Sequence, residues 1–96
     1  MKPSQALNRH RQDIRRIIAA HHVLNPRVFG SVLHGEDNEN SDLDLLVEPM
    51  PKTTLFDIGA IRSELRKLLG IRVDVLTPNS LPKKFKALIL SEAKPI

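Results

Sequence analysis

The fold depends most on Phe29-Gly30-Ser31 and on Ser41-Asp42-Leu43-Asp44-Leu45-Leu46-Val47-Glu48, two segments joined by a polar loop. The first predicts a short β-strand over 27–30 that Gly30 ends, followed by a single helical turn whose backbone N–H groups would face an anion. The second predicts a strand over 42–47. Alternation places Asp42, Asp44 and Leu46 on one face of it. This arrangement can hold a triphosphate and its metal ions.

Apolar spacing and end signals predict the remaining elements. They are a helix over 4–23 that Ser4 caps and Asn25-Pro26 ends, a helix from Thr53 or Thr54 to Leu69, a strand over 71–76, and a helix over 80–92 that Ser80 caps. We therefore predict an α+β fold, in which a small mixed β-sheet packs with three to four helices that cover it mainly on one side.

The composition sets limits on the class of protein. With 96 residues, the chain is expected to form one domain over 1–96. It has no cysteine, which excludes disulfides and thiolate metal sites. No apolar run approaches the ~20 residues that a membrane span requires, and we expect a cytoplasmic protein without a membrane partner. The net charge is +4, with an acidic centre over 34–48 inside a basic chain, which is what a cation-and-phosphate site would need. Charge alone favours the simpler interpretation, a solvated basic helix beside an acidic loop.

A third acid, Asp74, lies in the middle of the apolar strand over 71–76. A charge at such a position is costly unless it is paired or bound to a metal. If the strands over 42–47 and 71–76 are neighbours, Asp42, Asp44 and Asp74 reach one spot. Three carboxylates suit Mg²⁺, and two such ions would activate an attacking oxygen and neutralise a leaving pyrophosphate. Gly30 would let a phosphate approach the backbone, and Ser31 would add a hydroxyl and an amide.

Other interpretations of the same residues remain open at this point. Asp74 could be an edge residue paired with Arg72 or Arg62. For His10, His21 and His22 we favour surface or core packing over a metal site, since adjacent histidines on a helix diverge. Ser31 lacks an obvious base, which argues against a covalent nucleophile. The basic face around Arg15-Arg16 has no interleaved aromatic residues, so we do not expect nucleic-acid binding.

The chain resembles the nucleotidyltransferase superfamily that includes DNA polymerase beta, and more closely the minimal nucleotidyltransferases, or MNT proteins. The resemblance covers nearly the whole chain. Four segments carry it: Phe29-Gly30-Ser31, Ser41 to Glu48, Val73-Asp74-Val75-Leu76-Thr77-Pro78, and the ending Glu92-Ala93-Lys94-Pro95-Ile96.

The resemblance implies a nucleotidyltransferase fold and an antitoxin enzyme that uses Mg²⁺ and ATP. Such proteins accompany a HEPN ribonuclease toxin, with which a hetero-oligomer is expected, and some transfer AMP to a tyrosine hydroxyl of the toxin. Carried onto this chain, Gly30 and Ser31 would hold the triphosphate, and Asp42 and Asp44 would ligate both metal ions. Asp74 would ligate the catalytic ion and help to deprotonate the attacking hydroxyl.

One position departs from the family pattern. The family often has Arg before the second glycine of the turn, where this chain has His34 before Gly35. A guanidinium holds phosphate as a permanent fork, whereas a neutral imidazole does not. Since all three acids are present, we expect an active enzyme. The alternatives are an antitoxin that neutralises its toxin by stoichiometric binding without chemistry, and a nucleic-acid-binding regulator.

Overall fold

The computed structural model describes residues 1–96, and the main elements follow the order that the sequence predicts. These elements are α1 (Pro3–Ala19), β1 (Val23–Phe29), β2 (Leu43–Pro49), α2 (Leu55–Leu69), β3 (Val73–Leu76), the 3-10 helix η1 (Pro78–Ser80), α3 (Lys86–Glu92) and β4 (Lys94–Pro95). None of the helices is both long enough and apolar enough to cross a membrane.

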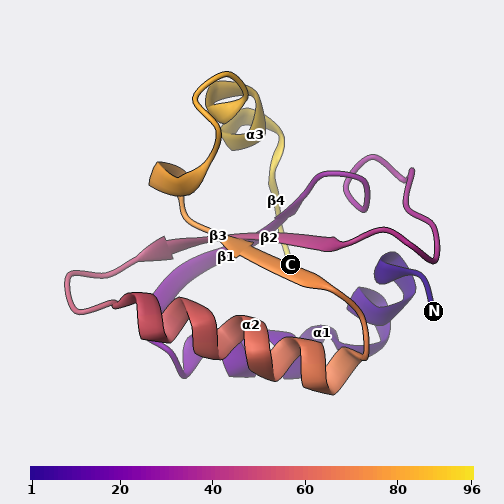
Figure 1. Ribbon diagram of the computed structural model, residues 1–96, viewed down its shortest axis with the longest axis horizontal. Helices are drawn as coiled ribbons and strands as arrows, with labels where there is room; N and C mark the ends of the chain where they lie inside the picture. The colour runs from indigo at the N-terminus through magenta and orange to yellow at the C-terminus, as the bar shows by residue number, and fades with distance from the viewer.

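The strands form one four-stranded mixed sheet in the order β3-β2-β1-β4. The strand β2 is parallel to β3, to which α2 connects it, whereas β1 is antiparallel to both β2 and β4. In Figure 1, α1 and α2 lie together on one side of the sheet, while η1 and α3 stand on the other side. The predicted α+β class, the mixed sheet and the number of helices are confirmed.

Alternation along β2 and β3 separates the two sides of the sheet, as the sequence predicts. The side toward α1 and α2 carries the main core, which comprises Leu7, Ile14, Ile18, Val23, Val28, Leu43, Leu45, Val47, Ile61, Leu65, Val73, Val75 and Ile96. Phe29 and Leu46 face the other side and form a smaller cluster with Leu81. Asp44 and Asp74 belong to this second side, because they alternate with the core residues of their strands.

The helix α2 begins and ends at the predicted residues. The Thr54 hydroxyl accepts the backbone N–H of Asp57, and the Asp57 carboxylate accepts the backbone N–H of Thr54. This reciprocal capping box satisfies two free donors at the start of the helix. Gly70 ends the helix in the left-handed conformation, with φ of 68°. The chain can therefore turn back at once, and β3 starts at Val73 beside β2.

The junction between α1 and β1 differs from the prediction. The helix ends at Ala19 instead of Val23, and the strand begins at Val23 instead of Arg27. Asn25-Pro26 therefore lies inside a strand and does not end a helix. The register against β2 shifts at this point, and Asn25 has φ of 52°. A bulge of this kind accommodates a proline, which has no N–H to donate to the sheet.

The last helix also starts later than the sequence predicts. Ser80 does not cap it; instead Ser80 closes η1, where its hydroxyl accepts the backbone N–H of Thr77. Leu81 is extended, with ψ of 144°, because Pro82 disfavours the α conformation in the residue before it. The helix α3 then begins at Lys86. The strand β4 was not predicted, since two residues leave no alternating pattern to read.

Candidate functional site

Asp44 and Asp74 lie at the same level on adjacent strands. The parallel register of β2 and β3 pairs Asp44 with Asp74, and the antiparallel register of β1 and β2 pairs Asp44 with Phe29. Asp42 directly precedes β2 and shares the face of Asp44 by alternation. The fold thus brings the predicted acids of two distant segments to one face, next to the end of β1, where Gly30 and Ser31 follow.

The carboxyl group of Asp44 has a raised pKa. No Lys, Arg or His forms an ion pair with this half-buried carboxyl group. Burial raises its pKa, and the negative charges of Asp74 and Asp42 raise it further, to about 6. Burial and like charges both disfavour the ionised form. The site therefore concentrates negative charge that a bound cation would relieve.

Gly30 lies directly against the Asp44 carboxylate. A Cβ atom built on Gly30 would lie 2.3 Å from Oδ2 of Asp44, which is closer than real Cβ contacts. Gly30 also has φ of 75°, a left-handed conformation that costs other residues ~1–2 kcal/mol. Glycine is therefore needed here for two separate reasons, and one of them is to leave room for Asp44.

The turn after β1 has the predicted helical character. The backbone N–H of His34 donates to the Gly30 carbonyl at 3.2 Å, and that of Glu36 donates to the Ser31 carbonyl at 2.9 Å. The Ser31 backbone N–H takes no part in these bonds. Free N–H groups at the start of such a turn are positioned to bind an anion.

Two arginines contact the outer acids. The Nε atom of Arg72 lies 2.9 Å from Oδ1 of Asp42, although the angle makes this an ion pair without a hydrogen bond. A guanidinium nitrogen of Arg66 lies 3.6 Å from Oδ1 of Asp74. Asp74 is on the edge strand and is paired with an arginine, but with Arg66 and not with Arg72 or Arg62. Both pairs are partly exposed to solvent, and such pairs are individually weak, on the order of 0–1 kcal/mol.

The acidic loop before Asp42 is held at three points. The Asp37 carboxylate accepts the backbone N–H of Ser4 at 2.8 Å, the Met1 ammonium donates to Glu39 at 2.7 Å, and Arg72 donates to the Asn40 carbonyl at 2.8 Å. Burial would raise the pKa of Asp37, but the hydrogen bonds from the backbone and side chain of Ser4 outweigh it and hold the pKa below its usual value. These contacts fix the path of the chain into β2.

The carboxylates fit a divalent cation by their chemistry. In the present arrangement no three His, Cys, Asp or Glu side chains are gathered closely enough to hold a metal ion, and two of the three acids contact arginines. Asp44, however, is unpaired and lies beside two further carboxylates. Hard oxygen donors of this kind are the ligands that Mg²⁺ takes in phosphate-transferring sites. The residues that would hold it are Asp42, Asp44 and Asp74.

The side chain of His34 contacts the end of α3. Its Nε2 atom lies 3.0 Å from the Glu92 carboxylate at the end of α3, and its side chain is about half exposed. The sequence did not predict this contact, nor those of Arg66 and Arg72 with the acids. A signal existed for Arg66 alone: its place in the last turn of α2 puts it beside the start of β3.

Comparison with known proteins identifies the family to which the chain belongs. The model of the nucleotidyltransferase domain family matches residues 7–96. A Methanocaldococcus jannaschii protein described as a candidate protein adenylyltransferase is 39% identical over 87 residues, which cover 91% of this chain and 94% of that protein. The protein adenylyltransferase MntA of Thermococcus cleftensis is 31% identical over 86 residues, which cover 90% of this chain and 84% of the relative.

Solved structures give the same result. A protein described as a candidate minimal nucleotidyltransferase superposes with a TM-score of 0.85 and 38% identity, covering 97% of this chain and 95% of that one. A toxin-antitoxin structure with AMP-PNP superposes with a TM-score of 0.73 at 19% identity, covering 88% of this chain and 69% of that one, and shares the fold. The chain is a nucleotidyltransferase, and it belongs to the nucleotidyltransferase domain family and, within it, to the minimal nucleotidyltransferases.

Proposed function

We propose that this chain is the antitoxin of a HEPN/MNT toxin-antitoxin pair and transfers AMP from Mg-ATP to a hydroxyl, that of a tyrosine, on its cognate HEPN toxin. The observation that carries the proposal is the register of Asp44 with Asp74, which concentrates negative charge beside the Gly30-Ser31 turn. Support comes from the relatives named as protein adenylyltransferases and from the shared fold of a toxin-antitoxin structure with AMP-PNP.

The chemistry divides among the residues of the site. In the transfer, the hydroxyl oxygen of the toxin bonds to the α-phosphorus of ATP, and the bond from that phosphorus to the pyrophosphate oxygen breaks. Mg²⁺, when bound, supplies positive charge that stabilises the attacking and leaving oxygens. Asp42 and Asp44 would hold the cation, and Asp74 would hold it and help to accept the proton that the hydroxyl loses. Gly30 and Ser31 bind the triphosphate through the turn that follows β1.

The arginines that contact Asp42 and Asp74 could be replaced there by a bound cation. Asp42 and Asp74 contact Arg72 and Arg66 through weak, partly exposed pairs, so both acids can turn to a cation at small cost. Asp44 has no such partner to release. Asp44 would therefore hold a cation without losing an ion pair, and Asp42 and Asp74 would hold it in place of their arginines.

A second function is favoured by one observation. His34 replaces the arginine that the family often has and contacts Glu92, so the turn lacks a permanent cation for the triphosphate. An antitoxin with this turn would neutralise the toxin by stoichiometric binding without transferring AMP. In that case the acids would be dispensable for neutralisation.

One experiment separates the two functions. The purified chain is incubated with its cognate HEPN toxin and Mg-ATP, and the toxin is then analysed by intact mass spectrometry. We expect an added AMP on the toxin with the wild-type chain, and none with Asp42→Asn, Asp44→Asn. A toxin that stays unmodified within an intact complex, together with full neutralisation by the double variant, would favour binding without chemistry.

A further inference from the structure

The outer surface of α3 and the turn before it combine positive charge with exposed apolar side chains. Over residues 77–91 the chain has Lys83, Lys84 and Lys86 and no acidic residue. Phe85 is 49% exposed and Leu88 is 54% exposed, and three-residue spacing places them side by side at the start of the helix. We call these five residues the α3 patch. None of its lysines forms an ion pair.

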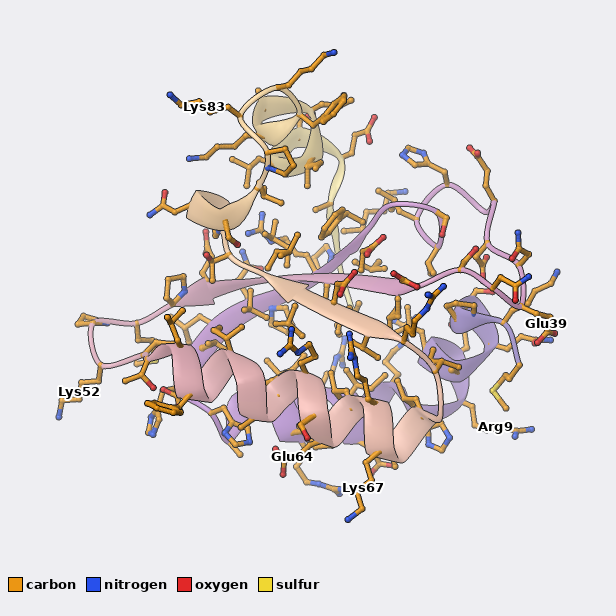
Figure 2. The ribbon with its side chains drawn as sticks, viewed as in Figure 1. Arg9, Glu39, Lys52, Glu64, Lys67 and Lys83 are labelled. Carbon is orange, nitrogen blue, oxygen red and sulfur yellow. The ribbon has the colours of Figure 1, made fainter.

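The patch is turned away from the body of the protein. The opposite surface of α3 carries Ile89 and Leu90, which pack against the small cluster of Phe29, Leu46 and Leu81. In Figure 1, α3 stands apart from α1 and α2, across the sheet. In Figure 2, Lys83 points outward from the turn before α3, whereas Lys52 and Lys67 lie on the other side of the molecule. Intramolecular packing therefore fixes α3 but leaves its patch uncovered.

The position of α3 relates the patch to the candidate site. Its inner cluster includes Leu46, which lies two residues after Asp44 and therefore on the same face of β2. At its end, Glu92 contacts His34 in the turn after Gly30 and Ser31. A macromolecule docked on the patch would therefore lie on the face of the sheet that carries the three acids.

We infer that the α3 patch docks the protein substrate of this enzyme, through a surface of that partner on which an apolar side chain is bordered by carboxylates. Charge complementarity supports this choice, since Phe85 and Leu88 lie in a segment that carries three lysines without an ion pair, and the Lys84 ammonium lies over the Phe85 ring. The partner's identity as a toxin rests on the proposed function; the surface and its chemistry do not.

A nucleic acid fits the patch less well than a protein does. The Phe85 ring, which would have to stack on a base, already lies under the Lys84 ammonium at 5.6 Å. Leu88, moreover, offers no contact that a ribose or phosphate needs. An apolar side chain of a protein, by contrast, would gain from burial against both Phe85 and Leu88.

The test compares two charge-matched variants. Lys83→Glu, Lys84→Glu, Lys86→Glu reverses the patch, and Lys52→Glu, Arg62→Glu, Lys67→Glu makes the same change in net charge on α2 and the loop before it. Dissociation constants for the cognate toxin are measured by calorimetry, with circular dichroism and ATP binding as checks on folding. We expect about a tenfold or greater weakening for the patch variant and about twofold or less for the control. Equal constants for the two variants would overturn the inference.

A second pair of variants addresses the apolar side chains. Phe85→Ala, Leu88→Ala should weaken toxin binding, whereas Leu55→Ala, Phe56→Ala, which truncates the most exposed apolar pair of the chain, should leave it unchanged. The reverse result would place the docking surface on α2 and overturn the inference. A fluorescein-labelled single-stranded RNA provides a third comparison. RNA binding that depends on the three lysines, with toxin binding unaffected by them, would also overturn it.

Kinetics distinguish this inference from the proposed function. At limiting toxin, the patch variant should transfer AMP more slowly than wild type, and at saturating toxin the two rates should agree within about twofold, since the patch does not touch the reacting atoms. A wild-type chain that binds toxin through the patch without transferring AMP would overturn the proposed transfer and leave the docking surface in place. Absence of any complex would overturn both.

Discussion

The two faces of β2 differ in what they contribute to the protein. On one face Leu43, Leu45 and Val47 are fully buried, each with 0% exposure, against α1 and α2. On the other face Asp44 is half-buried next to the acids and the turn after β1. The first face lowers the free energy of the folded state by removing apolar surface from water. The second face also buries Leu46 fully, but it raises the free energy of the folded state by bringing Asp44 close to like charges. It carries the acids that we assign to the proposed transfer. The core face therefore contributes to stability alone, whereas the other face combines a buried leucine with the proposed site.

The largest expected effect is on the rate of AMP transfer, from a change on the face of β2 that carries Asp44. Asp44→Asn removes the central carboxylate, and we expect the rate of AMP transfer to fall by about 10³-fold or more, because the charge that holds the cation is lost. The rate is measured with radiolabelled ATP and the cognate toxin. Asp13→Asn, an acid of α1 outside the site, should stay within about twofold of wild type. A rate for the Asp44 variant close to that of the control would contradict the assigned role.

A substitution on the opposite face of β2, which packs against α1 and α2, should lower stability instead of activity. Leu45→Ala leaves a cavity beneath α1 and α2, and we expect the free energy of unfolding in urea to fall by ~2–5 kcal/mol. Leu88→Ala, which truncates an exposed leucine, should change it by less than about 0.5 kcal/mol. The activity of the folded fraction of the Leu45 variant should remain close to wild type. A stable but inactive variant would show that the two faces are not separable.

A glycine pair tests the contact between the turn and Asp44. Gly30→Ala places a Cβ atom 2.3 Å from Asp44, whereas Gly35→Ala meets nothing within 4 Å, and both have similar positive φ angles. We expect ~1–2 kcal/mol of destabilisation from backbone strain in both, and a further ~1–3 kcal/mol from overpacking in Gly30→Ala alone. AMP transfer should also fall only in that variant. Equal losses of stability and activity in the two variants would reduce the role of Gly30 to its backbone conformation.

The smallest expected effect is a pH dependence of stability. The pKa of Asp44 is raised from 3.8 to about 6 in the folded protein, so the folded state binds the proton more tightly than the unfolded state does. Protonation of Asp44 therefore favours folding below pH ~4, and this contribution is lost as the pH rises through ~6. Partial solvent exposure limits it to ~1 kcal/mol.

The measurement compares wild type with Asp44→Asn in urea at pH 5 and at pH 8. The variant should gain stability relative to wild type at the higher pH, because it has no charge to be repelled by Asp42 and Asp74. A difference that stays constant across this range would show that Asp44 titrates near its ordinary value.

Local patterns in the sequence were sufficient to predict most of the fold, and alternation alone placed Asp42 and Asp44 on one face of β2. The two faces of β2 follow from strict alternation, and the ends of α2 follow from Thr54 and Gly70. The errors occurred where local rules competed: Asn25-Pro26 suggested the end of a helix but forms a bulge, and Pro82 separated two elements that apolar spacing had joined. In each case strand pairing or a proline outweighed local periodicity.

The contacts within the site could not be predicted in the same way. The pairing of Asp44 with Asp74 depends on the register of two strands separated by α2, and no local pattern specifies that register. Arg66, Arg72 and Glu92 reach the site from other elements as ordinary surface residues would. These three residues are far in sequence from the residues that they contact. Their contacts can be identified only when the fold is known, because they depend on which strand lies at the edge of the sheet.

The cluster of acids has a consequence for the lifetime of the protein in a cell. Without a cation, the repulsion among Asp42, Asp44 and Asp74 opposes folding, and a ligand that binds only the folded state stabilises it by about 2.7 kcal/mol at a hundredfold excess over its Kd. Under the proposed function, Mg-ATP would therefore protect the chain from proteases, which attack transiently unfolded molecules. The amount of antitoxin would then fall when cellular ATP falls, without any change in its synthesis.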